Sequence, residues 1–400
     1  MKSNYKRIGD HIKLVDERNR GLRIKQLLGL SISKQFIPSV ANIIGTDMEN
    51  YKIIRKNQFA CSTMQVRRDK KMPVALLQDI DEAIISQAYP VFEVKDVNQL
   101  LPEYLMMWFS RSEFDREACF HAVGGVRGSL EWEDFENMQL PIPSITKQRE
   151  IVKEYNTIQN RISLNQQLIQ KLEETAQAIY NQWFVDFEFP DETGKPYKSN
   201  GGEMVWNEEL NKEIPVGWRV AFLNTECDKL YGYPFDSNLF TEKPENNIPL
   251  IRIRDILNGY SDVYTSEIVD KKYILDNGDL LIGMDGIFHM SIWYSGKGYL
   301  NQRVVRFKPL SRGLSNLQVL FSIKQQIIDF EKNIQGTTVA HLSDKHIKEI
   351  TFLVGENRIQ NLITPLLFKL TQNINGKKQE IQKLTELNNL LLSKLATIEN

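Results

Sequence analysis

The sequence predicts an α+β protein made of two similar globular units, each followed by one long helix. Two observations support this prediction: an apolar stripe with helical spacing occurs twice, and the second half of the chain repeats the first at a constant distance. Such a repeat indicates two copies of one fold. Strand-like and helix-like stretches mix without regular alternation, which favours an α+β fold over an α/β fold.

The first long helix is predicted between residues 151 and 190. Apolar side chains recur there in alternating steps of four and three residues, the spacing of a coiled-coil seam. About 35–40 residues at about 1.5 Å rise make a helix of roughly 50–60 Å, which needs a partner for its apolar stripe. The seam positions are Ile151, Tyr155, Ile158, Ile162, Asn165, Ile169, Leu172, Ala176, Ile179 and Trp183.

A second helix in the same register lies 212 positions further along the chain and supplies that partner. Pro365 and Gly376 fall inside it, so we expect it to be shorter than the first helix or kinked. Its seam positions are Ile363, Leu367, Leu370, Ile374, Lys377, Ile381, Leu384, Asn388, Leu391 and Leu395.

Asn165 and Lys377 are equivalent polar positions on the two seams. A polar seam residue can set the register of a coiled coil at some cost in stability. The alternative is that both side chains lie at a solvated edge, and the sequence leaves both interpretations open.

The repeat extends upstream of the helices and sets the expected domain boundaries. Leu130 matches Leu342, and Phe135 matches Ile347, at the same distance. A stretch rich in Pro, Gly, Asn and Ser after Phe189 indicates a turn-rich linker. We expect a first globular unit at 1–143, a helix at 144–190, a linker at 191–213, a second globular unit at 214–354 and a C-terminal helix at 355–400.

Within the units, the pattern predicts several short strands and one main helix each. Ser144 is a candidate N-cap for the first long helix. In the first unit we expect strands at 51–54, 58–66, 74–77, 84–85 and 91–94, and a helix at 102–114. In the second unit we expect strands within 248–256, 272–286, 291–296 and 300–309, and a helix around 317–330.

Composition excludes some classes of protein. With 42% hydrophobic and 25% charged residues the chain is typical of a soluble globular protein, and no apolar run is long enough to span a membrane. Three scattered cysteines and the lack of a secretory signal favour a reduced, cytoplasmic protein. The net charge of −1 lacks the basic surplus of a stand-alone DNA-binding protein.

The sequence contains no convincing catalytic or metal-binding pattern. A phosphate-binding loop is missing, and so is the Asn/Asp-Pro-Pro-aromatic tetrapeptide of amino-methyltransferases. Pro190 and Asp191 lack a nearby Asp-x-Lys for a nuclease metal site. His341 and His346 do not have the spacing of metal ligands. We therefore expect a chain without catalytic residues, metal or cofactor of its own.

Basic and polar loop residues in both units are the candidates for nucleic-acid contact. Arginine and lysine on loops suit phosphate contacts, and arginine can also bind guanine with two hydrogen bonds. The alternative for each is an ordinary solvated charge. We expect Arg252 and Arg254 on one face of a strand because they alternate with isoleucines. The candidates are Arg67, Arg68, Lys70, Arg127, Arg252, Arg254, Arg303, Thr337, Thr338 and His341.

The whole chain resembles the DNA-specificity subunit of type I restriction–modification systems. Five stretches support this resemblance by their order along the chain: WFVDFEFP at 183–190, GKPYKSNGG with KEIPVGW after it, GDLLIGMDG at 278–286 with LNQRV at 300–304, GTTVAHLS at 336–343, and LLLSKL at 390–395. Residues 57–73 depart from the GDLL-type pattern, and VGENRIQ replaces the usual proline-rich start of the second helix.

The resemblance implies two target recognition domains separated by two long helices that pack as an antiparallel coiled coil with pseudo-two-fold symmetry. It implies that the chain binds double-stranded DNA, with each domain recognising one half of an asymmetric split site. Two methyltransferase subunits that use S-adenosylmethionine would dock on it, and two restriction subunits that use ATP and Mg²⁺ would complete the complex.

Two other functions remain open. The chain is alternatively a stand-alone DNA-binding regulator, against which the lack of a basic surplus argues, or a coiled-coil scaffold without DNA contact. Co-purification with a methyltransferase discriminates between these and the specificity subunit. The half-site sequences do not follow from the sequence, because groove contacts depend on loop conformations.

Overall fold

The computed structural model describes residues 5–39, 47–124, 128–245, 247–333 and 340–398. The chain forms two compact units: Met1–Arg161 with Lys383–Asn400, and Ile162–Gln382. We call them the first and the second unit. Within the described ranges, every helix is too short or too polar to cross a membrane.

Two four-stranded sheets and several short helices make up the first unit. The strand orders are β2–β9–β6–β7 and β4–β3–β8–β5, and β3–β8 is the parallel pair. Stacked rings of Phe59 and Phe92, 4.9 Å apart, lie in the core beside Phe109 and Phe135. The bounds are β1 Tyr5–Arg7, α1 Ile8–His11, β2 Ile12–Val15, β3 Leu27–Leu30, β4 Phe36–Pro38, β5 Lys52–Arg55, β6 Gln58–Cys61, α2 Val66–Asp69, β7 Val74–Leu76, β8 Glu82–Ile85, β9 Val91–Val94, α3 Pro102–Phe109, α4 Ser112–His121, α5 Trp132–Asn137 and β10 Gln139–Pro141.

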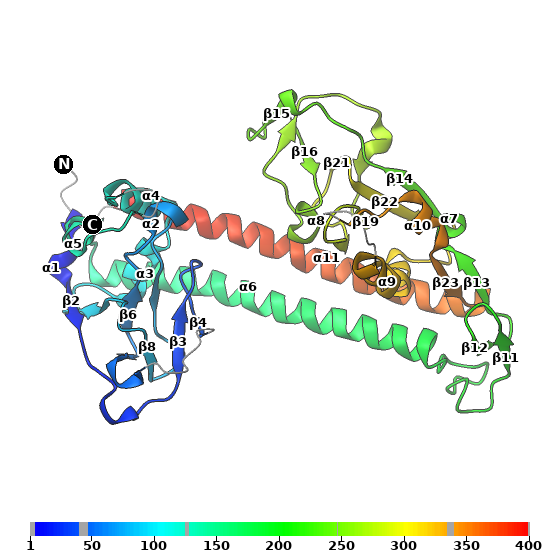
Figure 1. Cartoon of the computed structure of the whole chain (residues 1–400), viewed down its shortest axis with the longest axis horizontal. Coiled ribbons are helices and arrows are strands. Elements are labelled where there is room, and N and C mark those ends of the chain that lie inside the picture. Colours follow the sequence, from blue (N-terminus) through cyan, green and yellow to red (C-terminus); the bar gives the residue numbers. More distant parts are fainter. Residues whose placement is uncertain (1–4, 40–46, 125–127, 246, 334–339, 399–400) are drawn as a thin grey trace. The chain divides into compact units, whose positions relative to one another are not determined.

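In the second unit, α9 (Figure 1) packs against a sheet through its buried apolar side chains. Val319, Ile323 and Ile327 of this helix are fully buried against Ile282 and Phe307 of the sheet. The bounds are β11 Met204–Asn207, β12 Lys212–Pro215, β13 Arg219–Phe222, α7 Leu223–Glu226, β14 Cys227–Tyr231, β15 Phe240–Thr241, β16 Ile248–Ile251, α8 Asp255–Asn258, β17 Tyr264–Thr265, β18 Ile274–Leu275, β19 Leu280–Gly283, β20 Met290–Ile292, β21 Gly298–Leu300, β22 Val304–Pro309, α9 Asn316–Asn333, α10 Asp344–Glu349 and β23 Thr351–Val354.

The two units have the same strand topology, which confirms the internal repeat. The order β14–β22–β19–β20 corresponds to β2–β9–β6–β7, and β17–β16–β21–β18 corresponds to β4–β3–β8–β5. The parallel pair recurs at the same place, as β16–β21 in the second unit and β3–β8 in the first. The second unit adds β15 at one edge of its sheet.

Residues 57–73, which depart from the family pattern in sequence, begin with the same turn in structure. In the second unit, Gly278 has a φ of 98° and the carboxylate of Asp279 accepts a hydrogen bond from the backbone N–H of residue 276. In the first unit, Asn57 has a φ of 68° and the amide oxygen of Gln58 accepts from the N–H of residue 55. Different residues therefore hold one turn before β6 and before β19.

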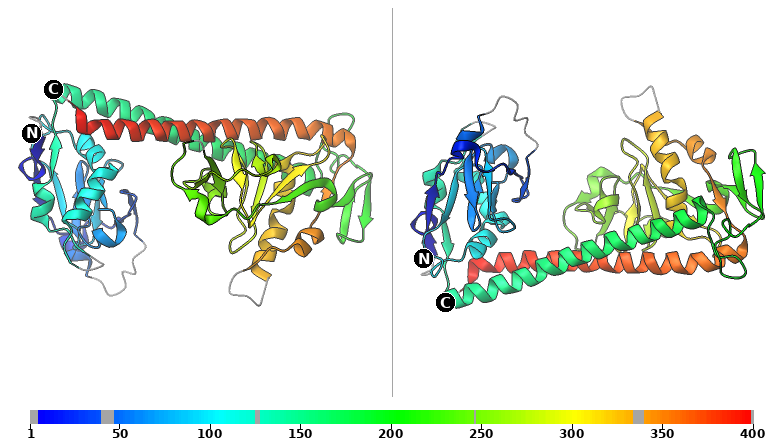
Figure 2. Two further views of the ribbon diagram at one scale, coloured as in Figure 1. Left: turned by 90° about the horizontal axis from the view of Figure 1, so that it is seen from above. Right: turned by 90° about the horizontal axis from the view of Figure 1, so that it is seen from below.

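Two long helices, α6 (Ile145–Tyr180) and α11 (Asn357–Lys394), run side by side (Figure 1), as the further views also show (Figure 2). In the first unit the start of α6 packs against the end of α11, and in the second unit the end of α6 packs against the start of α11. The pair is therefore antiparallel, which confirms the predicted coiled coil. Ser144 caps α6, because its Oγ accepts from the N–H of Lys147 at 3.4 Å.

None of the predicted seam positions is exposed; each is buried or half-buried. Asn165 is only 1% exposed, and its amide nitrogen has no hydrogen-bond partner among the described residues. A solvated edge is therefore the wrong interpretation for Asn165. Lys377, in contrast, is partly exposed and pairs with Glu380 at 2.9 Å.

Pro365 does not shorten the second long helix, contrary to the expectation from the sequence. The helix runs from Asn357 to Lys394 with the proline inside it. Ile363 and Leu367, on either side of Pro365, are fully buried in the cluster that joins both helices to the second unit. This burial offsets the hydrogen bond that the proline ring removes.

One glutamine near the start of each long helix fastens that helix to the domain before it. Gln148 of α6 is fully buried, and its amide donates to the carbonyls of Gln99 and Pro143 at 2.8 and 2.9 Å. Its oxygen accepts from the N–H of Leu101 at 2.9 Å. A single side chain therefore satisfies three backbone groups where the domain meets the helix.

Gln360 of α11 stands 212 positions after Gln148 and does the same in the second unit. It is 4% exposed. When the amide nitrogen faces the surrounding acceptors and the oxygen faces the donors, the nitrogen donates to the carbonyl of Gly313 at 2.9 Å. Its oxygen accepts from the N–H of Gly355 at 3.0 Å. Gln360 also exchanges two hydrogen bonds with the side chain of Gln318, so the repeat preserves a buried glutamine at this place but not the individual bonds it makes.

Some predicted elements differ from those observed. The predicted helix at 102–114 is two helices, α3 and α4, and the predicted strand at 58–66 ends at Cys61 and is followed by α2. The stretch expected to be a linker contains β11 and the first half of β12, which form an antiparallel hairpin. Tyr197 of this stretch stacks on Phe189 at 4.6 Å, so aromatic packing orders a segment whose composition favours turns.

We predict that Gln148→Ala lowers the free energy of unfolding by about 2–4 kcal/mol, because three backbone groups lose their partner and a fully buried side chain is removed. Denaturant unfolding followed by circular dichroism measures the change. Gln170→Ala, on the exposed face of the same helix, is the control and should change stability by less than about 0.5 kcal/mol. Equal effects of the two substitutions would contradict the role of Gln148.

Candidate nucleic-acid interface

Three turns meet at one edge of the second unit and form an open hollow of about 550 Å³. The parallel strands β16 and β21 are paired at their last residues, so the turns after them lie side by side. The loop between β19 and β20 completes the hollow. It is lined by Arg252, Ile253, Arg254, Asp285, Ile287, His289, Asn301, Gln302 and Arg303.

Asp285 is the centre of the polar contacts in this hollow. Its carboxylate lies 3.3 Å from Nε of Arg303 and 2.6 Å from Nδ1 of His341. The two partners come from different segments, the turn after β21 and the stretch after α9, and both are substantially exposed. One carboxylate therefore orients two predicted contact residues toward solvent.

The prediction that Arg252 and Arg254 share a strand face is wrong. β16 ends at Ile251, and both arginines lie in the turn that follows. Arg252 is bound by Asp255 and Asp262 at 2.7 and 2.6 Å, and these carboxylates hold the turn in shape. Arg254 is exposed at the start of α8.

In the first unit the candidate residues lie on and beside the short helix α2, which follows β6. Arg67 and Arg68 are exposed, and Lys70 ends the helix in a left-handed conformation with a φ of 51°. Nη1 of Arg67 donates to the carbonyl of Gly124 at 3.0 Å, and Arg68 forms an ion pair with Asp69. The loop after β6 in the first unit corresponds to the loop after β19 in the second unit, and it is longer and more basic.

A buried ion pair holds α2 in position. Lys34 lies 2.8 Å from Asp115 of α4, and both side chains are about nine-tenths buried. The same carboxylate accepts the backbone N–H of Met72 at 3.0 Å, just after α2. Burial lowers the pKa of Lys34, while the charge of Asp115 opposes that shift. Asp115 therefore ties the basic loop to the domain core.

Three predicted contact residues, Arg127, Thr337 and Thr338, lie outside the described residues. Two residues that sequence reasoning missed, Asp285 and Asp115, organise the predicted ones. Asp285 could have been recognised from the sequence, because it follows a predicted strand and lies in GMDG, a typical turn sequence. Asp115 had none, since its partner Lys34 is far away in the sequence.

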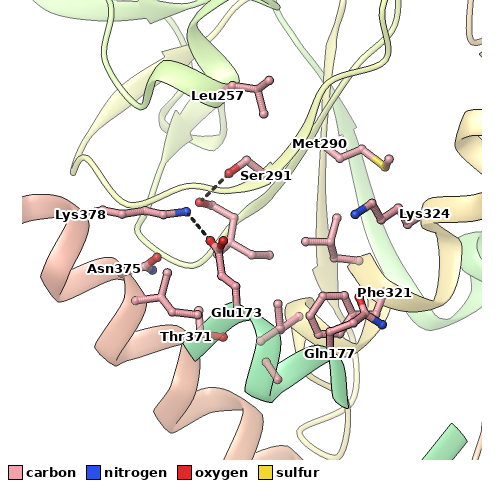
Figure 3. A pocket seen from close by; sticks show the side chains of 15 residues that line it. Glu173, Gln177, Leu257, Met290, Ser291, Phe321, Lys324, Thr371, Asn375 and Lys378 are labelled. Carbon is pink, nitrogen blue, oxygen red and sulfur yellow. Dashed lines mark hydrogen bonds and ion pairs between the residues drawn. The ribbon is translucent and has the colours of Figure 1, made fainter. Parts of the chain in front are cut away.

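A cavity, the potential metal ligands and the cysteines are further features of the described residues. A cavity of about 340 Å³ lies between the helix pair, α9 and β20 of the second unit (Figure 3). Its lining mixes apolar and polar side chains, and among them Lys378 pairs with Glu173 at 3.1 Å (Figure 3). The described residues contain no cluster of three potential metal ligands. Burial raises the pKa of the Cys227 thiol to about 12, so it stays neutral.

Comparison with known proteins agrees with this architecture. The family model described as "Type I restriction modification DNA specificity domain" matches residues 41–174 and 215–386, once in each repeat. The chain belongs to this family.

Similar curated proteins are also specificity subunits by name. The type I restriction enzyme EcoBI specificity subunit of Escherichia coli is 27% identical over 193 residues, which is 48% of this chain but only 40% of that protein. The HindI specificity subunit of Haemophilus influenzae is 21% identical over 89% of both chains. The MjaIX specificity subunit of Methanocaldococcus jannaschii is 22% identical over 74% of this chain and 68% of its own length.

A solved structure supports the fold. The crystal structure of a type I restriction–modification system S subunit from M. genitalium aligns with 99% of this chain and 96% of its own, with a TM-score of 0.59 and 15% identity.

We predict that Asp115→Ala destabilises the first unit by about 3–5 kcal/mol, because it leaves the ammonium of Lys34 buried without its partner. Thermal or denaturant unfolding measures the loss. Glu150→Ala removes one partner of an exposed ion pair on α6 and should cost less than about 0.5 kcal/mol. A loss for Asp115→Ala no larger than for Glu150→Ala would show that the pair does not hold the domain together.

Proposed function

We propose that this chain is the DNA-specificity subunit of a type I restriction–modification complex, in which each domain recognises one half of a two-part DNA sequence. The observation that best supports the proposal is one fold occurring twice with different side chains at the same place. The loop after β6 presents Arg67, Arg68 and Lys70, and the loop after β19 presents Asp285. Unlike loops on like scaffolds suit two unlike half-sites.

The chain contributes recognition in this proposal, and its partners contribute chemistry. Two methyltransferase subunits with S-adenosylmethionine modify the DNA, and two restriction subunits with ATP and Mg²⁺ cleave it. The net charge of −1 supports this division, because a protein that binds DNA alone needs a surplus of basic residues to neutralise phosphates. The partners supply the remaining positive charge.

Exposed apolar side chains on the long helices support the docking of partner subunits there. In the second unit, Leu362 and Phe368 of α11 are 47% and 57% exposed and lie off the seam. In the first unit, Leu387 and Leu390 are 50% and 59% exposed. Apolar residues that both helix segments leave in solvent are suited to burial against another protein.

In this proposal the helices also set the distance between the half-sites. α6 has 36 residues and α11 has 38, so each is roughly 55 Å long at about 1.5 Å per residue. One turn of DNA is about 34–36 Å. A helical spacer of this length separates two recognition domains by more than one turn.

We predict that the chain, co-expressed with its methyltransferase subunit, directs adenine methylation to one asymmetric two-part sequence. Methylation sequencing of the host DNA measures both halves and the gap. The isolated chain should bind the same duplex weakly and with little preference, as a fluorescence-anisotropy titration at fixed salt would show. Tight, sequence-specific binding by the chain alone would contradict the proposed division of labour.

We also predict that inserting one heptad in the middle of both α6 and α11 lengthens the gap by about three base pairs and leaves both halves unchanged. Seven residues preserve the seam and add about 10 Å, which is about three steps of 3.4 Å along DNA. Methylation sequencing again gives the gap. A four-residue insertion in α6 alone is the control and should abolish methylation because it breaks the register. An unchanged gap in the heptad variant would refute the spacer role.

A further inference from the structure

Arg303 occupies a strained and tightly fixed turn in the hollow of the second unit. Its φ is 70°, the left-handed region that side chains other than glycine rarely adopt. Its carbonyl accepts the N–H of Met284 at 2.8 Å, and the neighbouring Gln302 N–H donates to the carbonyl of Tyr233 at 2.9 Å. Strained backbone that the surrounding structure holds in place is typical of functional positions.

Among the described residues, Asp285 is the ion-pair partner of the Arg303 side chain. Asp285 contacts Nε, and the terminal nitrogens Nη1 and Nη2 form no hydrogen bond or ion pair with any described residue. The side chain is 57% exposed, so a ligand can approach it from solvent, and among the described residues no partner competes for these two nitrogens. Fixing the guanidinium before binding reduces the rotamer entropy that recognition would otherwise cost.

We propose that Arg303 binds a guanine in the half-site of the second domain, with Asp285 as its positioning residue; this inference rests on the proposed function. The guanidinium fork matches O6 and N7 of guanine in the major groove. A phosphate fits the site less well, because the carboxylate of Asp285 beside the fork would repel it. The same carboxylate is suited to the amino group of the paired cytosine, which donates a hydrogen bond to Asp or Glu.

The composition of the hollow agrees with a base rather than a second protein as ligand. Asp285 is its one carboxylate among the lining residues, and Arg254 and His289 add further donors. Arg252 is already neutralised by two carboxylates and serves the turn. Arg303 is therefore the lining arginine that is both oriented by a neighbour and open at its fork.

The corresponding turn and loop of the first unit, which the structure describes, contain no counterpart of this pair. The turn after β8, which corresponds to the turn after β21, begins with Ser86 and Gln87 and contains no arginine. The loop after β6 has Ser62 and Thr63 directly after the strand, where the second unit has Asp285 close behind β19. We therefore expect Arg303 with Asp285 to recognise guanine only in the half-site that the second domain binds.

The test is methylation sequencing of cells that express the full chain with its methyltransferase subunit. In the wild type we expect at least one required guanine in one half-site. In Arg303→Ala that position should accept other bases, with roughly a 10–100-fold loss of preference, while the other half and the gap stay unchanged. Asp285→Asn should weaken preference at the same position by a smaller factor. Arg312→Ala, an exposed arginine of the same domain outside the hollow, should change nothing.

Arg303→Gly separates recognition from folding. Glycine accepts the left-handed conformation without strain, so the melting temperature of this variant should not fall, yet the guanine preference should be lost as in Arg303→Ala. Unchanged preference at every position in both variants would overturn the inference and leave the proposed function intact. An equal loss at all sequences would also overturn it, since a phosphate contact acts in that way. A wild-type complex without any two-part motif would overturn both proposals.

Discussion

Burial of one narrow apolar stripe on each long helix is the interaction on which the rest of the structure depends. Neither α6 nor α11 could keep its stripe out of water alone, because each stripe covers only one side of the helix. At each end of the pair the seam merges with a core of the adjoining unit: Ile151 and Leu395 join the core of the first, and Ala176 and Leu367 join a core of the second. Helix pairing and domain docking are therefore one packing event in each unit.

The buried glutamines near the helix starts explain how two domains of different sequence attach to their long helices in the same way. A side-chain amide can satisfy backbone groups of any sequence, since it has both donors and an acceptor. The residues that contribute these groups differ between the repeats: Leu101 and Pro143 in one, Gly313 and Gly355 in the other. The surrounding loops have been free to diverge while the attachment stayed the same.

Much of the fold could be predicted from periodicity, because burial on one face imposes it. The seam shows this periodicity in the sequence alone, while strands such as 91–94 were predicted from short apolar runs that are buried on both faces. The break expected at Pro365 was wrong, because burial of the residues on either side outweighs the low helix propensity of proline. At the candidate interface, the polar loops of the sequence suggested Arg303 and His341, which stay predictions, and the alternation with isoleucines wrongly placed Arg252 and Arg254 on a strand face. The acids that organise these loops, Asp285 and Asp115, act through contacts distant in sequence, which no local pattern encodes.

The composition of the first unit bears on the order in which the chain can fold. Its core includes Leu392 and Leu395, and the hydroxyl of Tyr5 donates to the carbonyl of Ala396 at 2.9 Å, across nearly the whole sequence. The second unit, in contrast, consists of one continuous stretch, Ile162–Gln382. During synthesis the second unit can therefore complete its core while the first still lacks residues 383–398. A ribosome-bound chain would hold an unfinished first domain until the segment that closes it emerges, and chaperones would have to protect that domain during this interval.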